Sequence, residues 1–195
     1  MLDVEVIADP AAAVSALDPV RGRLLAELTE PASAAALATR VGISRQKVNY
    51  HLRALEDHRL VRQAGERRWG GLRERLLVAT AMSYVVSPRA LGPVAADPGR
   101  SNDRLSASYL IALAARAVRE VGELWAAARK ADKRLATLSI DTAIRFRSPA
   151  DRAAFTQELS DAVTSLVARY HDESDAHGRA YRLVVAAYPK PEEET

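Results

Sequence analysis

The side chains best suited to bind a ligand lie in segment 45–53, where guanidinium, ammonium, carboxamide and phenol groups occur close together. These groups belong to Arg45, Gln46, Lys47, Asn49, Tyr50 and Arg53. They can donate hydrogen bonds to phosphate oxygens, and the amides can also pair with base edges. No carboxylate occurs between Arg45 and Leu55, although an ordinary surface helix would mix both signs of charge. The composition therefore indicates contact with a polyanion.

The spacing of apolar residues in this segment predicts an amphipathic helix. Val48, Leu52 and Leu55 stand at i, i+4 and i+7 and would form one buried stripe. The opposite face would carry Gln46, Tyr50 and Arg53. Such a face is typical of a recognition helix that lies along nucleic acid.

Two kinds of contact are expected from the exposed face. A side-chain amide can pair with adenine through two hydrogen bonds, so Gln46 and Asn49 are candidate base readers. Arg45, Lys47 and Arg53 can instead bind phosphates. The alternative is an ordinary solvated surface, which is what most runs of charge are.

The flanking residues predict a helix, a tight turn and a second helix. Ser33 can cap a short helix that reaches Val41, and Gly42 supplies the break after it. Ser44 can cap the second helix, which should reach about Asp57.

Residues upstream of Ser33 predict two more helices. Residues 10–17 are rich in alanine, and Asp18 with Pro19 supplies a cap and a first-turn proline for the next helix. Both would cover the apolar side of the helix pair, which the pair cannot bury alone. A strand or an extended arm is expected from the apolar residues Val4, Val6 and Ile7.

A hairpin should follow the second helix. Segments 60–63 and 72–79 have the composition of strands, and in the second of them Arg73 and Arg75 share a face with Leu77. The turn-rich stretch 64–71 between them carries Arg67 and Arg68. A hairpin with a basic tip directly after a recognition helix is a wing, and its arginines can reach a minor groove.

Charge is concentrated in this region. The whole chain of 195 residues has a net charge of +3, yet residues 40–75 contain ten Arg and Lys and only four Asp and Glu. Cysteine is absent, which excludes disulfides, thiolate metal sites and Cys nucleophiles. The chain has no Gly-rich phosphate loop, nucleophile elbow or His-Glu-x-x-His helix, so we expect neither an enzyme nor a cofactor.

Residues 8–88 resemble the arsenic-repressor-like (ArsR-type) winged helix-turn-helix transcription regulators of bacteria. The matching stretches are ALDPVRGRLLAEL, AAALATRVGISRQKVNYHLRALEDHRLV and the wing end ERLLVATAMSYVVSP, and the most specific pattern is Ser44-x-x-x-Val48-x-x-His51-Leu52-x-x-Leu55. The resemblance implies a DNA-binding homodimer, a repressor relieved by a small molecule or another signal. The cysteine set of the metal-sensing branches is missing here. A winged helix that binds another protein instead of DNA is the alternative.

The C-terminal part is expected to dimerise or to sense a signal. Segment 87–102 contains three prolines and two glycines and reads as a linker, so we predict a DNA-binding domain at 1–88 and a second domain at 89–195. A long helix should follow from Asp103 to about Arg134, and its Gly122 would let another helix approach closely. A two-fold mate would cover its apolar stripe, which consists of Leu110, Leu113, Ala117, Val121 and Leu124.

The remaining residues predict a strand, a helix and a strand. Segment 137–147 alternates strictly between apolar and polar residues, Ser148 and Pro149 open a helix that reaches about Tyr170, and segment 180–188 is apolar on both faces. The expected fold class is mainly α with α+β character: an N-terminal winged helix-turn-helix, then a helix-strand-helix-strand module for dimerisation or sensing.

The composition offers two further candidate ligand sites. His171, Asp175 and His177 offer metal ligands, although an ordinary polar loop has the same residues. The aromatic residues can line an apolar effector pocket or simply fill a core; they are Tyr109, Trp125, Phe146, Phe155, Tyr170, Tyr181 and Tyr188. The expected partners are double-stranded DNA, a second copy of the chain and an apolar small molecule. A membrane is not expected, because no apolar run is long enough to span one and the N-terminus lacks a signal peptide, which predicts a cytoplasmic location.

Overall fold

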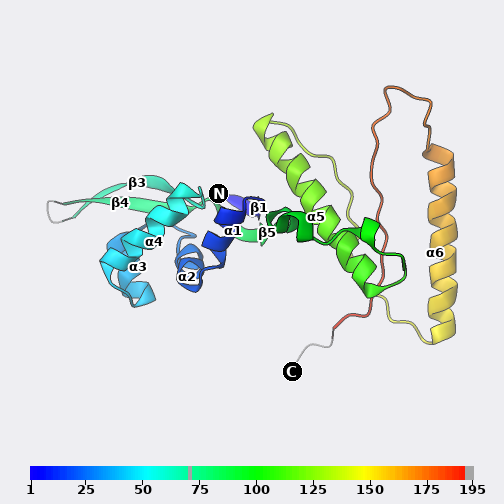
Figure 1. Cartoon of the computed structure of the whole chain (residues 1–195), viewed down its shortest axis with the longest axis horizontal. Coiled ribbons are helices and arrows are strands. Elements are labelled where there is room, and N and C mark those ends of the chain that lie inside the picture. Colours follow the sequence, from blue (N-terminus) through cyan, green and yellow to red (C-terminus); the bar gives the residue numbers. More distant parts are fainter. Residues whose placement is uncertain (70–71, 192–195) are drawn as a thin grey trace. The chain divides into compact units, whose positions relative to one another are not determined.

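The computed structural model describes residues 1–69 and 72–191. Contacts divide the chain into two compact units, Met1–Leu135 and Ala136–Thr195. Figure 1 shows the elements along the chain. The long helix that the sequence prediction assigned to the second domain is part of the first unit.

Four short helices form the N-terminal part of the first unit. They are α1 (Pro10–Leu17), α2 (Pro19–Glu27), α3 (Ala34–Val41) and α4 (Arg45–Asp57). The core between them is made of leucine and valine side chains with no exposed surface; these are Leu24, Leu28, Leu37, Val48 and Leu55. The apolar stripe predicted for the second helix of the pair is therefore confirmed.

The ends of α3 and α4 follow from the capping residues. The Oγ atoms of Ser33 and Ser44 each accept a hydrogen bond at 3.3 Å, from the amides of Ala36 and Lys47 respectively. Gly42 ends α3 with φ at +73°, in the left-handed region that favours glycine. These contacts confirm the predicted helix, turn and helix.

The wing is a three-stranded antiparallel sheet in the order β2-β4-β3. Its strands are β2 (Ala32–Ser33), β3 (Val61–Trp69) and β4 (Leu72–Ala79). β3 is longer than predicted: Arg67 and Arg68 lie within the strand and not in the tip, because they pair with Glu74 and Arg73 of β4. A register shift after Gln63 absorbs one residue, as a β-bulge does. Gly70 and Gly71 of the expected tip lie outside the described residues.

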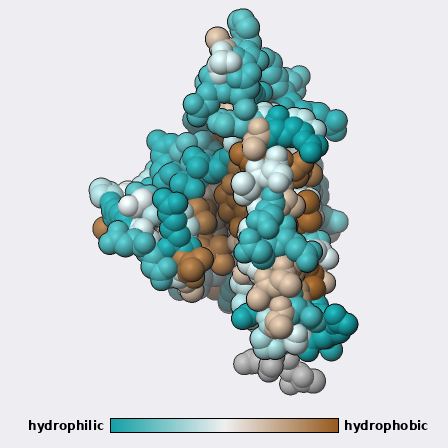
Figure 2. All heavy atoms as spheres, turned by 90° about the vertical axis from the view of Figure 1, so that its right-hand side faces the viewer, coloured by the Kyte–Doolittle hydropathy of each residue, from teal (hydrophilic) through white to brown (hydrophobic). Residues whose placement is uncertain are grey.

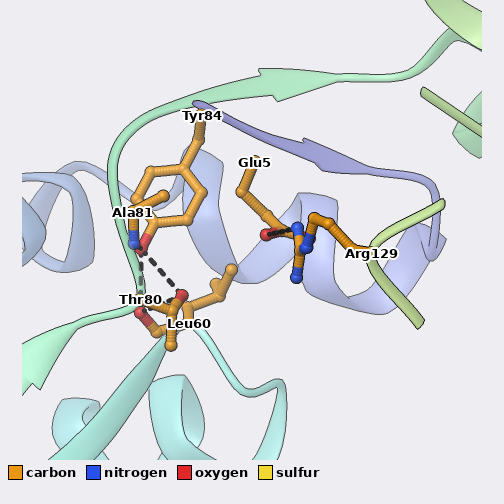
Figure 3. Close-up of polar contacts among 6 residues, drawn as sticks. All are labelled: Glu5, Leu60, Thr80, Ala81, Tyr84 and Arg129. Carbon is orange, nitrogen blue, oxygen red and sulfur yellow. Dashed lines mark hydrogen bonds and ion pairs between the residues drawn. The ribbon is translucent and has the colours of Figure 1, made fainter. Parts of the chain in front are cut away.

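A second, two-stranded sheet lies at the base of the wing. Here β1 (Leu2–Ile7) pairs in parallel with β5 (Ala81–Val86), a strand that the sequence did not predict. The hydroxyl of Tyr84 on β5 donates to the carbonyl of Leu60 at 2.8 Å and accepts from the amide of Ala81 at 3.2 Å (Figure 3). Tyr84 thus holds together the residues that begin and end the β3–β4 hairpin.

The long helix α5 (Ala107–Lys130) packs on this second sheet. Gly122 is buried, and a Cβ atom built on it would lie 2.8 Å from Cγ1 of Val6 on β1. The close approach that Gly122 permits is therefore to a strand of the same chain and not to another helix. An ion pair at 3.0 Å between Arg129 and Glu5 adds a polar contact (Figure 3). Before α5, the expected linker forms two short 3-10 helices, η1 (Pro88–Val94) and η2 (Pro98–Arg100).

The second unit contains one long helix, α6 (Pro149–Tyr170), which Ser148 caps by accepting from the amide of Asp151 at 3.1 Å. The two expected strands do not form in this single chain: residues 137–147 and 180–188 have no regular secondary structure. A strand needs a second backbone to satisfy its amide and carbonyl groups, and neither segment takes part in a strand pairing among the described residues. Several hydrophobic side chains of this unit are exposed, among them Leu138, Ile140 and Tyr181. Figure 2 shows hydrophobic residues at the surface.

Candidate nucleic-acid interface

Helix α4 presents its polar face to solvent. The six predicted contact residues on it are all exposed: Arg45, Gln46, Lys47, Asn49, Tyr50 and Arg53. Val48, Leu52 and Leu55 are at most 3% exposed beneath them. Tyr50 is 67% exposed, which for a large aromatic side chain means that it contributes little to the core. The face is therefore free to contact a ligand along its length.

Contacts with α2 fix the last turn of α3, which leads into the turn before α4. The guanidinium of Arg23 donates to the carbonyl of Val41 at 2.8 Å, and Arg40 forms an ion pair with Glu27 at 3.6 Å. Both contacts join the last turn of α3 to α2. They orient α3, and through Gly42 they orient the start of α4.

A groove of about 280 Å³ lies between α4 and β4. Four arginines line it, Arg45 and Arg53 from α4 and Arg73 and Arg75 from β4, together with the candidate base reader Asn49. Two carboxylates, Glu56 and Glu74, also line the groove, so its charged side chains still sum to a net positive charge. Guanidinium groups on both walls favour a polyanion in the groove. Arg73 and Arg75 were not among the predicted contact residues, although the alternation of β4 already placed both on one face.

The wing arginines are divided between the two faces of the hairpin. Arg68 lies directly opposite Arg73, whereas Arg67 pairs with Glu74 on the other face at 3.2 Å. Like charges directly opposite each other destabilise a sheet, so the pair of Arg68 and Arg73 favours an anionic partner on that face. Glu66 offsets this repulsion in part, at 3.8 Å from Arg73.

One groove arginine is bound by carboxylate and amide groups. Arg75 contacts Glu56 at the end of α4, and its Nε donates to Oε1 of Gln63 on β3 at 3.1 Å. The side chain therefore connects α4 to both long strands of the wing. This contact sets the angle between the two elements that flank the groove.

Residues 16–64 match a family model described as a helix-turn-helix domain. This part of the chain is a helix-turn-helix domain. The match supports a DNA-binding transcription regulator, since such a domain places its second helix in the major groove. Among solved structures, NolR from Sinorhizobium fredii is similar, with 25% identity, coverage of 36% of this chain and 67% of that chain, and a TM-score of 0.31. None of the curated proteins matches the chain.

Asp18 caps the helix that supports the helix-turn-helix. Its Oδ1 accepts from the amides of Arg21 at 2.9 Å and Val20 at 3.0 Å. The hydrogen bond from the Arg21 amide, helped by the charge of its guanidinium, lowers the pKa of Asp18 below its usual value, against a smaller opposing effect of burial. The carboxylate form is therefore the one that stabilises the start of α2.

The predicted metal ligands in the second unit are not brought together. His171 lies 3.2 Å from Glu173, while the carboxylate of Asp175 accepts from the amide of His177 at 2.8 Å. Within residues 1–69 and 72–191, no group of three or more His, Asp or Glu side chains can hold a metal ion. These residues lie in a polar loop, in which Asp175 binds the backbone and His171 contacts a neighbouring side chain.

The aromatic residues considered for an effector pocket are dispersed. Phe146 and Phe155 lie with ring centroids 5.3 Å apart, and Trp125 lies beneath the guanidinium of Arg129 at 5.5 Å. Three tyrosines are largely exposed, namely Tyr170, Tyr181 and Tyr188.

The predicted dimerisation stripe of α5 is only partly covered. Leu110, Leu113 and Ala117 are half-buried, whereas Val121 and Leu124 are 47% and 55% exposed. The exposed end of the stripe lies beside Gly122, on the part of α5 that packs on β1.

No helix of the described chain is long and apolar enough to cross a membrane.

Proposed function

We propose that this chain is a homodimeric transcription regulator that binds duplex DNA through α4 and the wing. The observation that carries the proposal is the groove between α4 and β4, whose two walls are lined by Arg45 and Arg53 on one side and Arg73 and Arg75 on the other. Phosphates of one strand would bind these arginines while the exposed amides of α4 contact base edges.

A binding function of this kind fits the chemistry of the surface better than catalysis. The exposed groups of the predicted contact residues on α4 are cations, amides and the phenol of Tyr50, all of which can donate hydrogen bonds to an anion. The sequence contains none of the catalytic motifs considered above. We therefore propose a binding protein and not an enzyme.

Dimerisation and response to a signal belong to the same proposal. A single winged helix contacts one half-site, and specific affinity generally requires two half-sites related by a two-fold axis. Val121 and Leu124 of α5 offer exposed apolar surface for such an axis. The resemblance to ArsR-type regulators supports repression and its relief by a small molecule or another signal.

Salt dependence tests the DNA-binding part. The full chain is titrated with a random-sequence duplex pool at about 50 mM and about 200 mM salt, with fluorescence anisotropy as the readout. Binding that weakens steeply with salt is expected, because each phosphate contact releases counterions. Failure to bind duplex at about 50 mM salt would overturn the proposal and favour a winged helix that binds another protein.

A further inference from the structure

Segment 137–147 combines an alternating sequence with an unsatisfied backbone. Leu138, Ile140 and Ile144 are 82%, 85% and 51% exposed. Within residues 1–69 and 72–191, no backbone hydrogen bond and no strand pairing involves this segment. Its amide and carbonyl groups and its apolar face thus both remain open to a second strand.

The charges of segment 137–147 indicate which strand it can pair with. Arg147 already forms an ion pair with Asp151 at 2.9 Å, whereas Asp141 and Arg145 have no ion pair within the described part of the chain. Asp141 and Arg145 lie symmetrically about Ala143. When two copies pair antiparallel about Ala143, Asp141 of each copy lies opposite Arg145 of the other.

The same register also matches the apolar face. Ile140 lies opposite Phe146 and Thr142 opposite Ile144, because residues directly opposite each other in a sheet share a face. The ring of Phe146 already contacts Phe155 of α6, so α6 of the same chain begins to cover this face. The paired strands would therefore have one face on helices and one polar face in solvent.

Other pairings fit the charges less well. Parallel pairing in register would place Asp141 against Asp141 and Arg145 against Arg145, which is unfavourable. Segment 180–188 of the same chain contains Arg182 and no acidic residue, so it offers Arg145 no partner.

We propose that segment 137–147 pairs with its counterpart in a second copy, as an antiparallel two-fold ribbon centred on Ala143. This inference rests on the homodimer of the proposed function and names a contact that holds it. The segment then forms a strand only when two copies pair, which explains why it has no strand partner in a single chain.

Disulfide trapping tests the register. The chain contains no cysteine, so Ala143→Cys introduces a single thiol, which would lie opposite its own counterpart at a distance that a disulfide can bridge. The matched control is Ser139→Cys: eight residues would separate its two copies along the strands, about 27 Å. Under mild oxidation, a covalent dimer is expected for Ala143→Cys only. Equal cross-linking of both variants, or of neither, would overturn the proposal.

Charge exchange provides a second, independent readout. Asp141→Arg or Arg145→Asp alone places like charges opposite each other twice in the dimer, and should weaken self-association by about tenfold in sedimentation. The double variant restores opposite charges and should recover the affinity. A double variant no tighter than either single variant would overturn the register.

Duplex binding measured on the same samples separates this proposal from the proposed function. A salt-sensitive DNA-binding dimer that Ala143→Cys does not cross-link would refute the ribbon alone. A chain that cross-links at Ala143→Cys yet binds no duplex would refute the regulator and leave the ribbon supported.

Discussion

The guanidinium of Arg75 on β4 donates hydrogen bonds to both carboxylate oxygens of Glu56, the residue next to the end of α4. Bidentate pairs of this kind fix direction as well as distance. Arg75 is 53% exposed and Glu56 is 24% exposed, so the pair is accessible from the groove. Glu56 therefore orients the wing and also neutralises one of the groove arginines.

Removing the charge of Glu56 should strengthen DNA binding. In Glu56→Gln the amide oxygen can still accept a hydrogen bond from Arg75, while the guanidinium becomes available to a phosphate. We expect tighter duplex binding and a slope of log affinity against log salt that is steeper by about 0.9. Asp57→Asn is the matched control, because it removes the same negative charge from an exposed residue next to Glu56. Equal effects of the two variants would mean that Arg75 is not released.

The two wing arginines should differ in their contribution to affinity. Arg68 lies on the face of Arg73, whereas Arg67 pairs with Glu74 on the opposite face. Arg68→Ala should weaken binding to every duplex and lower the salt slope by about 1, and Arg67→Ala should do so less. Fluorescence anisotropy at several salt concentrations measures both. A larger loss for Arg67→Ala would show that the other face of the wing contacts DNA.

The helix-turn-helix was predictable because its signals are local. Ser33, Gly42 and Ser44 act within a few residues of their own positions, and Val48, Leu52 and Leu55 repeat with the period of a helix. The exposed residues of α4 follow directly from that period, since the face opposite a buried stripe must meet solvent.

The rest of the site depends on contacts between distant residues. The pairing of β1 with β5 joins segments about 80 residues apart, and no local pattern specifies such a partner. Arg75 is recognisable in the sequence as a basic residue, but its contact with Glu56 joins residues 19 positions apart in two different elements. Gly122 indicated a close approach without indicating that Val6 would be the neighbour.

The cap of α2 should contribute to stability in a pH-dependent way. Asp18→Ala should lower the free energy of unfolding by about 1 kcal/mol, whereas Asp18→Asn, which can also cap, should cost little. Because folding lowers the pKa of Asp18, its charge-dependent stabilisation is fully present above the usual pKa of an unfolded Asp and is lost as the pH falls through the lowered value. Urea unfolding at about pH 7 and about pH 3 should therefore show the Asn variant approaching wild type in acid. A constant difference would contradict this assignment.

Assembly through α5 can be tested at its exposed end. Val121→Glu with Leu124→Glu adds charge to side chains that are 47% and 55% exposed in the single chain, so the fold of α5 should survive. If this surface forms the dimer axis, the variant should be monomeric in sedimentation and lose tight DNA binding. Exposed Ala126→Glu is the control for added charge on the same helix. A dimeric double variant with full DNA affinity would place the axis elsewhere.

The most direct measurement of the central claim compares three substitutions on α4. Binding of Lys47→Ala, Arg53→Ala and Asn49→Ala is measured on a duplex selected from a random pool and on the unselected pool, across a range of salt. Loss of a phosphate contact in Lys47→Ala or Arg53→Ala should weaken both duplexes alike and lower the salt slope by about 1. Asn49→Ala should instead cost about 1 to 3 kcal/mol on the selected duplex and little on the pool. Unchanged binding in all three variants would contradict the assignment of α4 as the recognition helix.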